Sequence, residues 1–241
     1  MKVLLAAESG SRAWGFASPD SDYDVRFIYV HQPQWYFNIK PQADTIDVML
    51  DDHLLDLSGW ELRKALGLMM KTNPAMSDWL ESPIVYYADE DFLAQMRRLN
   101  AAFYSPKAGI GHFLSLAHNH LKRYLQVDGE GYTLKRVLYY LRALLCCRWL
   151  EKNETHPPVL FTDLVEATVP EQHIKDIISD MLVKKSASRE HNKDAVDSVL
   201  TDYAFTIFTH YQQLLPHYQP RRQPTGRESD LSAMLMATVL S

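Results

Sequence analysis

The chain has 241 residues, of which 46% are hydrophobic and 23% are charged, and its formal net charge is −5. These values are ordinary for a soluble globular protein of one large or two small domains. The overall charge shows no basic excess, so it neither supports nor excludes a polynucleotide substrate. No apolar run is long enough to span a membrane, and the two cysteines lack zinc-ligand spacing, so we expect a cytoplasmic protein without a membrane partner.

The first part of the chain is predicted to be mixed α/β. Short β-branched and aromatic runs indicate strands, and a helical period follows the fourth of them. The expected strands cover residues 3–7, 25–30, 45–50, 54–57 and 84–87, and the expected helix covers residues 60–71.

From about residue 89 onward the pattern becomes helical. Leucines recur on one face of the third long segment, which is typical of a helix that packs along one side. The expected helices cover residues 89–103, 108–127, 134–151, 171–185 and 194–215. A proline-containing stretch, 216–230, is predicted to be a loose tail before a short terminal helix, 231–240. We therefore predict two domains, 1–88 with a small mixed sheet and 89–241 with helices.

Gly10-Ser11-Arg12 follows the first expected strand directly. Glycine lets a ligand approach the backbone closely because it has no Cβ. The N–H groups at the start of a helix attract phosphate, and an arginine can bind phosphate through two hydrogen bonds. This tripeptide is therefore a candidate phosphate-binding turn.

Asp22 and Asp24 lie at the start of the next expected strand. Side chains two positions apart on a strand point to the same face, and two carboxylates placed so would repel each other without a cation between them. Mg²⁺ is commonly bound by one or two carboxylates together with substrate phosphates. A phosphate-binding turn beside such a pair indicates phosphoryl transfer.

Three alternatives compete with that interpretation. Asp22 is a common residue type in turns and caps, and a Gly-Ser dipeptide is common in loops. A calcium loop beginning at Asp20 is excluded, because such a loop needs glycine at its sixth position and glutamate at its twelfth. Val25 and His31 occupy those positions. The ordered combination of strand, Gly-Ser, spacer, Ser-Asp-x-Asp and strand favours metal and phosphate chemistry over turn chemistry.

The segment resembles the signature of the polymerase-β-like nucleotidyltransferase superfamily, in which Gly-Ser precedes Asp-x-Asp by about ten residues. The longer string Gly-Ser-Arg-Ala-x-Gly-x-x-x-x-x-Ser-Asp-x-Asp-x-Arg, from Gly10 to Arg26, is similar to predicted bacterial nucleotidyltransferases associated with RNA repair. Further matches to that group lie in 56–66, 73–74, 79–86 and 135–142. The resemblance implies an α/β (α+β) fold, with a small mixed-sheet nucleotidyltransferase core followed by a helical domain.

The resemblance also implies a third carboxylate on a neighbouring strand, which would join the first pair around two metal ions. Asp56 lies directly before the helix expected from residue 60, and Asp47 lies in a strand-like setting as well. We favour Asp56, which makes Asp22, Asp24 and Asp56 the predicted catalytic and metal-binding residues. The metal would be Mg²⁺, with Mn²⁺ as an alternative.

Lys135, Tyr139 and Arg142 are spaced so that they share one face of a helix. One interpretation is a solvated amphipathic surface. The other is a charged face that closes over the triphosphate, and the resemblance favours this one. We therefore add these three residues to Gly10, Ser11 and Arg12 as candidate nucleotide-binding residues.

The predicted reaction is transfer of a nucleoside monophosphate from a nucleoside triphosphate to an acceptor hydroxyl, with release of pyrophosphate. An RNA end is one candidate acceptor. A protein side chain or a small molecule is the first alternative, which the acidic net charge favours because contact with RNA relies on lysine and arginine. The second alternative is a domain that binds nucleotide or RNA without catalysis. The full set of aspartates argues against it.

Overall fold

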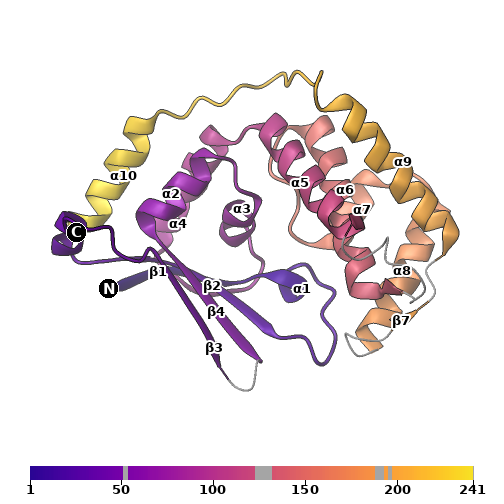
Figure 1. Cartoon of the computed structure of the whole chain (residues 1–241), viewed down its shortest axis with the longest axis horizontal. Helices are drawn as coiled ribbons and strands as arrows, with labels where there is room; N and C mark the ends of the chain where they lie inside the picture. Colours follow the sequence, from indigo (N-terminus) through magenta and orange to yellow (C-terminus); the bar gives the residue numbers. More distant parts are fainter. Residues whose placement is uncertain (51–53, 123–131, 188–192, 195–196, 241) are drawn as a thin grey trace. The chain divides into compact units, whose positions relative to one another are not determined.

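The computed structural model describes residues 1–50, 54–122, 132–187, 193–194 and 197–240, and its contacts divide the chain into two compact units (Figure 1). The first, which we call the sheet unit, comprises Met1–Ala13, Asp22–Tyr104 and Pro224–Ser241. The second, the helical unit, comprises Trp14–Ser21 and Ser105–Gln223. No helix among the described residues is both long enough and apolar enough to cross a membrane.

A five-stranded mixed sheet underlies the sheet unit, with the strand order β3-β4-β2-β1-β5. Strands β2 and β4 run parallel, and the other neighbouring pairs run antiparallel (Figure 1). The strands are β1 (Lys2–Glu8), β2 (Tyr23–Val30), β3 (Thr45–Leu50), β4 (Leu55–Glu61) and β5 (Val85–Ala88). The predicted mixed α/β fold class is therefore confirmed.

Helices cover this sheet with apolar side chains. The cluster that they form with β1 and β2 includes Leu4, Ile28 and Leu66, each at most 4% exposed. The helical segments of the unit are α1 (Gly10–Ala13), the 3-10 helix η1 (Pro33–Phe37), α2 (Leu62–Met70), α3 (Pro74–Leu80), α4 (Glu90–Phe103) and α10 (Glu228–Leu240). The sequence analysis did not predict α3, although Asn73 caps its first N–H groups and Pro74 follows.

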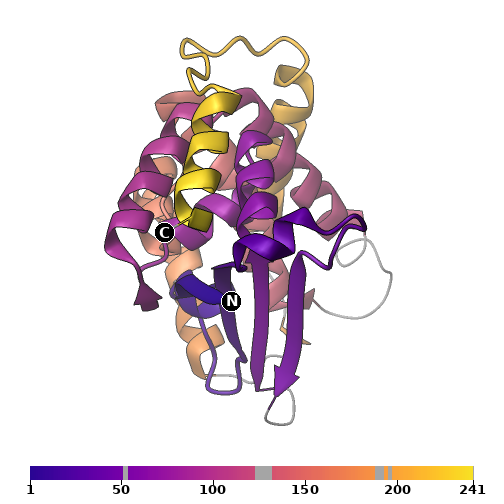
Figure 2. The same ribbon diagram turned by 90° about the vertical axis from the view of Figure 1, so that its left-hand side faces the viewer.

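The units differ from the predicted division after residue 88. Helix α4 packs against β1 and α2, and α10 packs against α2 (Figure 2). Leu231 and Met234 of α10 are buried in the same apolar cluster, and the N–H groups of Thr225 and Gly226 donate to the carbonyl oxygen of Ala102. The end of the chain is thus part of the sheet unit, because its apolar side chains are buried there.

The helical unit is arranged around α6 (Leu134–Asn153), in which 12 of the 20 residues are buried. Leu138, Leu141 and Leu145 of the predicted stripe are fully buried, and α6 packs against α5, α7 and α9. The other elements are α5 (Pro106–His120), α7 (Phe161–Thr168), α8 (Gln172–Ala187), α9 (Ser198–Leu214) and the short strands β6 (Tyr132–Thr133) and β7 (Lys193–Asp194). The predicted helix end at residues 123–127 lies outside the described residues.

The segment after α9 is held to the end of α6. Glu154, which follows α6 in a left-handed conformation with φ 55°, is only 5% exposed. Its carboxylate accepts hydrogen bonds from the N–H groups of Arg221 (2.7 Å) and Arg222 (2.9 Å) and from the Tyr218 hydroxyl (3.2 Å). Residues 218–222 of the stretch predicted to be a loose tail, 216–230, are therefore anchored to the end of α6, while residues 216–227 form no helix or strand.

Candidate active site

Two of the predicted carboxylates lie side by side on the parallel strands. The register pairs Asp24 of β2 with Asp56 of β4. Arg26 follows two positions after Asp24 and therefore lies on the same face of β2. Its Nη2 donates to Asp24 Oδ1 (2.5 Å) and Asp56 Oδ2 (2.8 Å), and its Nη1 donates to the carbonyl oxygen of Asp56 (3.1 Å). One guanidinium thus joins the two carboxylates.

The environment of Asp24 opposes its negative charge. Burial raises its pKa from 3.8 to about 6, and the neighbouring charges of Asp22, Asp56 and Glu8 act in the same direction, while Arg26 opposes them. A group whose charged form is disfavoured in this way, in contact with several acids, is a common feature of functional sites. A further cation at this position would relieve the repulsion.

Glu8, at the end of β1, binds the backbone of Asp24. Its side chain is buried, and its Oε1 accepts a hydrogen bond from the N–H of Asp24 (2.8 Å). Its Oε2 accepts from the Tyr86 hydroxyl, and burial and Glu8 together raise the pKa of Tyr86. Glu8 was not among the residues predicted from the sequence, although an acid that directly follows an apolar strand and precedes Gly-Ser was a usable signal.

Gly10 allows the turn after β1 to approach Asp24. Its backbone has φ +60°, a left-handed conformation that favours glycine. A Cβ at this position would lie 2.2 Å from Asp24 Oδ2. The glycine in this turn predicted that the missing Cβ makes room for a ligand. The structure shows that it makes room for a carboxylate of the chain itself.

Arg12 and Ser11 complete the turn. Arg12 Nε donates to the carbonyl oxygen of Asp22 (3.0 Å), and its guanidinium lies 3.7 Å from the centre of the Tyr23 ring. Ser11 is buried. The Gly-Ser turn and the Asp-x-Asp strand are therefore linked to each other by direct contacts within the sheet unit.

Asp47 lies farther from Asp24 than Asp56 does. It is on the outer strand β3, where the register pairs it with Ser58, and its Oδ1 accepts a hydrogen bond from the Ser58 hydroxyl (2.5 Å). Asp56 is directly opposite Asp24 and shares its arginine. The geometry therefore favours Asp56 as the third carboxylate, and its role as a metal ligand stays a prediction.

The donor atoms of this site fit a hard divalent cation. Within the described residues no three acidic, histidine or cysteine side chains already form a metal-binding group. Arg26 pairs with one oxygen of each of Asp24 and Asp56. The remaining oxygens, together with those of Asp22, are ligands that Mg²⁺ and Mn²⁺ accept. Burial is the main cause of the raised pKa of Asp24, and the neighbouring acids add to it while Arg26 opposes it.

Tyr139 and Arg142 of α6 contact the segment that joins the two halves of the motif. The Arg142 guanidinium lies 4.2 Å from the centre of the Trp14 ring, and the Tyr139 ring lies 4.8 Å from that of Trp14. Arg142 is only 4% exposed, so it is not on a solvated surface. Lys135, one turn before Tyr139, is half-buried. Nucleotide binding by these three residues stays a prediction.

A buried lysine holds the same joining segment. Lys185 of α8 is 1% exposed, and its Nζ donates to the Ser18 hydroxyl (2.6 Å). The Ser21 hydroxyl in turn accepts from the N–H of Ser18 (3.0 Å). The Trp14–Ser21 segment is therefore packed within the helical unit. No sequence signal connected Lys185 with the motif.

Comparisons with known proteins found a matching family and similar proteins. Residues 1–234 match the model of the RlaP family, described as the RNA repair pathway DNA polymerase beta family. The uncharacterized protein YcgL of Bacillus subtilis is 39% identical over 239 residues, which cover 99% of this chain and 90% of that protein. The crystal structure of a nucleotidyltransferase-like protein from Exiguobacterium sibiricum matches with 12% identity and a TM-score of 0.27, covering 99% of this chain and 83% of that one.

The family model covers nearly the whole chain, including the Gly-Ser turn, the carboxylates and α6. The resemblance found in the sequence is therefore confirmed. This chain belongs to the RNA repair pathway DNA polymerase beta family.

Proposed function

We propose that the chain transfers a nucleoside monophosphate from a nucleoside triphosphate to an acceptor hydroxyl. The observation that carries this proposal is the pair Asp24 and Asp56, placed opposite each other on parallel strands and joined by Arg26. Gly10 of the Gly-Ser turn lies against the carboxylate of Asp24. Paired acids beside a phosphate-binding turn suit phosphoryl transfer, in which the protein mainly positions groups and stabilises charge.

Each predicted site residue of the sheet unit has a proposed role in the reaction. Asp22, Asp24 and Asp56 would hold Mg²⁺ or Mn²⁺, which supplies positive charge next to the reacting phosphate. Gly10, Ser11 and Arg12 would bind the β- and γ-phosphates of the triphosphate. Nucleotide binding by Lys135, Tyr139 and Arg142 is a separate proposal, because it rests on the resemblance.

In the proposed reaction the oxygen of the acceptor hydroxyl attacks the α-phosphorus, and a new P–O bond forms. The bond between that phosphorus and the bridging oxygen to the β-phosphate breaks, and pyrophosphate leaves with the electron pair. The hydroxyl proton passes to the carboxylate of Asp56. Arg12 stabilises the negative charge that develops on the leaving pyrophosphate.

We propose an RNA end as the acceptor, because the matching family is described as part of an RNA repair pathway. The net charge of −5 favours the alternative of a protein or small-molecule acceptor. A chain that binds nucleotide without transfer is the remaining alternative. The three lead to different products and can be separated in one assay.

The test incubates the protein with each α-labelled nucleoside triphosphate and Mg²⁺ or Mn²⁺, with an RNA that ends in a 3′-hydroxyl, with a cell extract, or without an acceptor. We expect label on the RNA with wild-type protein and with Asp47→Asn, the matched exposed control on β3. Asp22→Asn should remove it. Label on protein or on a small molecule would replace the RNA acceptor. Nucleotide binding without any labelled product would support the non-catalytic alternative.

A further inference from the structure

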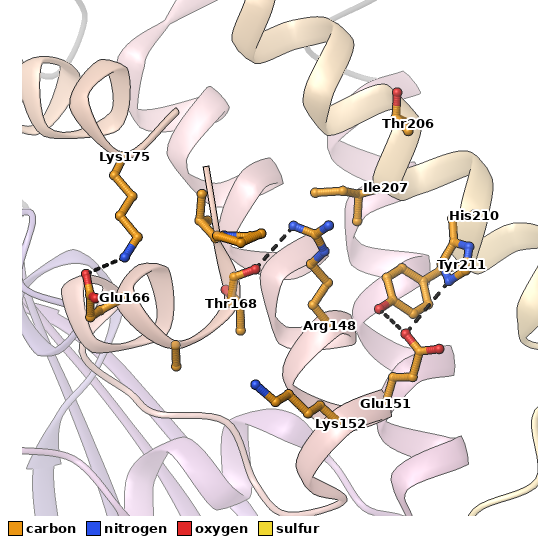
Figure 3. Close-up of a pocket in the computed structure, with 13 residues that line it drawn as sticks. Arg148, Glu151, Lys152, Glu166, Thr168, Lys175, Thr206, Ile207, His210 and Tyr211 are labelled. Atoms are coloured by element: carbon orange, nitrogen blue, oxygen red, sulfur yellow. Dashed lines mark hydrogen bonds and ion pairs between the residues drawn. The ribbon is translucent and has the colours of Figure 1, made fainter. Parts of the chain in front are cut away.

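A polar cavity lies wholly within the helical unit (Figure 3). It has a volume of about 670 Å³, within the range of cavities that hold small ligands. Its walls come from α6, α8 and α9 and from the end of α7. The side chains that matter for its chemistry are Arg148, Lys152, Glu166, Lys175 and Glu151.

Arg148 lies at the centre of the cavity lining and is held by neutral partners (Figure 3). Its Nη1 donates to the carbonyl oxygen of Thr168 (3.2 Å) and to the hydroxyl of Tyr203. Its guanidinium also lies 5.3 Å from the centre of the Tyr203 ring. Within the part of the chain that the structure describes, Arg148 forms no ion pair with a carboxylate. Its orientation is therefore set by uncharged groups, and the nearby carboxylate of Glu171 acts on the Tyr203 hydroxyl rather than pairing with Arg148.

The two acidic residues of the cavity bind side chains other than Arg148. Glu151 accepts a hydrogen bond from the Tyr211 hydroxyl (2.7 Å) and lies 3.7 Å from His210 Nε2. Glu166 pairs with Lys175 at 2.7 Å. Figure 3 shows Glu151 turned toward Tyr211 and His210, away from Arg148.

Lys152 adds a second uncompensated charge. It is exposed, follows Arg148 by one turn of α6, and has no ion-pair partner among the described residues. Besides His210, three cationic and two anionic side chains line the cavity, an excess of one positive charge among the lining residues. The whole chain, in contrast, carries −5. The cavity is thus a local site for an anion.

We propose that this cavity binds the phosphate group of a nucleotide-like ligand, either a free nucleotide or an RNA chain. The planar guanidinium of Arg148 matches phosphate through paired hydrogen bonds, and Lys152 contributes a mobile point charge. The volume exceeds that of a phosphate, and Val169, Pro170 and Ile207 supply apolar wall for a nucleoside. The site uses no residue of the Gly-Ser or Asp-x-Asp motif, so it stands independently of the proposed transfer reaction.

Calorimetry on the full chain without divalent metal tests the proposal. The probes are pyrophosphate, AMP, and a short oligoribonucleotide with a 5′-phosphate or a 5′-hydroxyl. We expect the phosphate-bearing probes to bind and Arg148→Gln to weaken binding by about tenfold or more, as for a lost charge-assisted hydrogen-bond pair. Lys152→Gln should weaken it by about threefold or more. Tighter binding of the oligoribonucleotide than of AMP would identify RNA as the source of the phosphate, and the reverse would identify a free nucleotide.

Two matched variants make the result specific. Arg136→Gln removes an exposed arginine from the same helix outside the cavity, and it should leave binding unchanged. Arg12→Gln alters the motif turn of the sheet unit. If Arg12→Gln abolishes binding while Arg148→Gln and Lys152→Gln do not, the phosphate binds elsewhere and the proposal is wrong. Absence of binding by every phosphate probe would overturn it as well. Lys152 is exposed, so its variant stays informative if Arg148→Gln fails to fold.

Discussion

The two units place an arginine in opposite electrostatic settings. Arg26 of the sheet unit lies between the carboxylates of Asp24 and Asp56. Arg148 of the helical unit bonds to a carbonyl oxygen and a tyrosine hydroxyl, and the nearby carboxylate of Glu151 is occupied by Tyr211 and His210. In the first setting several acids surround a cation, and in the second a cation is held by uncharged groups.

This difference indicates which ligand charge each region accepts. Carboxylates that repel each other favour a cation at the sheet unit, and the charges of Asp22, Asp56 and Glu8 add to the effect of burial in raising the pKa of Asp24. A fixed guanidinium with neutral partners favours an anion at the helical unit. Variants that change the charge or the close packing in one unit only test this difference.

The largest effect is expected from Asp24→Asn. This variant keeps the size of the side chain and one acceptor oxygen but removes the charge that would hold the metal. Transfer should fall on the order of a hundredfold or more, equivalent to about 2.7 kcal/mol of barrier. Nucleotide binding should fall less, because it also draws on Gly10, Ser11 and Arg12. A labelled-transfer assay and calorimetry on the same variant measure the two effects, and near wild-type transfer would remove these carboxylates from the catalytic centre.

Gly10→Ala tests whether close packing against Asp24 is needed. The new Cβ would lie 2.2 Å from Asp24 Oδ2, on a backbone with φ +60°. We expect a loss of about 1–3 kcal/mol in the free energy of unfolding, together with reduced transfer. Gly67→Ala is the matched control, because a Cβ there meets nothing within 4 Å and Gly67 lies within helix α2. It should be neutral or slightly stabilising, and equal effects of the two substitutions would contradict the proposed packing role.

Arg26→Gln removes the cation that joins the two carboxylates. The uncompensated charge should lower the free energy of unfolding of the metal-free chain by about 1–3 kcal/mol. Added Mn²⁺ should then stabilise the variant more than the wild type, since the ion no longer competes with the guanidinium. Thermal unfolding with EDTA and with Mn²⁺ measures both effects. A smaller stabilisation by Mn²⁺ than in the wild type would show that Arg26 helps to hold the metal rather than replacing it.

The last test concerns pH. The pKa of Asp24 is about 6 in the folded chain and 3.8 without the fold, so the folded state binds this proton more tightly. The contribution of Asp24 to stability is therefore fully present below about pH 4 and is lost as the pH rises through about 6. Asp24→Asn cannot titrate. Its free energy of unfolding, relative to wild type, should rise over this window in urea unfolding with EDTA. A flat difference would show that Asp24 is not desolvated.

Local patterns were sufficient for much of the fold. Apolar and β-branched runs located all five strands of the sheet, and the leucine stripe located α6, because these signals depend only on neighbouring residues. The short helices α3 and α7 were missed, since seven or eight residues carry little periodic signal. The buried position of α10 was missed as well, because its neighbours are far away in the sequence.

The same distinction applies to the candidate site. Residue types and spacing alone predicted the Gly-Ser turn and the candidate carboxylates Asp22 and Asp24. Only the tertiary structure decided that Asp56 lies opposite Asp24, that Arg26 joins them, and that Glu8 supports them from β1. It also decided that Lys185 holds Ser18 within the helical unit. These pairings depend on strand register and helix packing between distant segments, which no local pattern encodes.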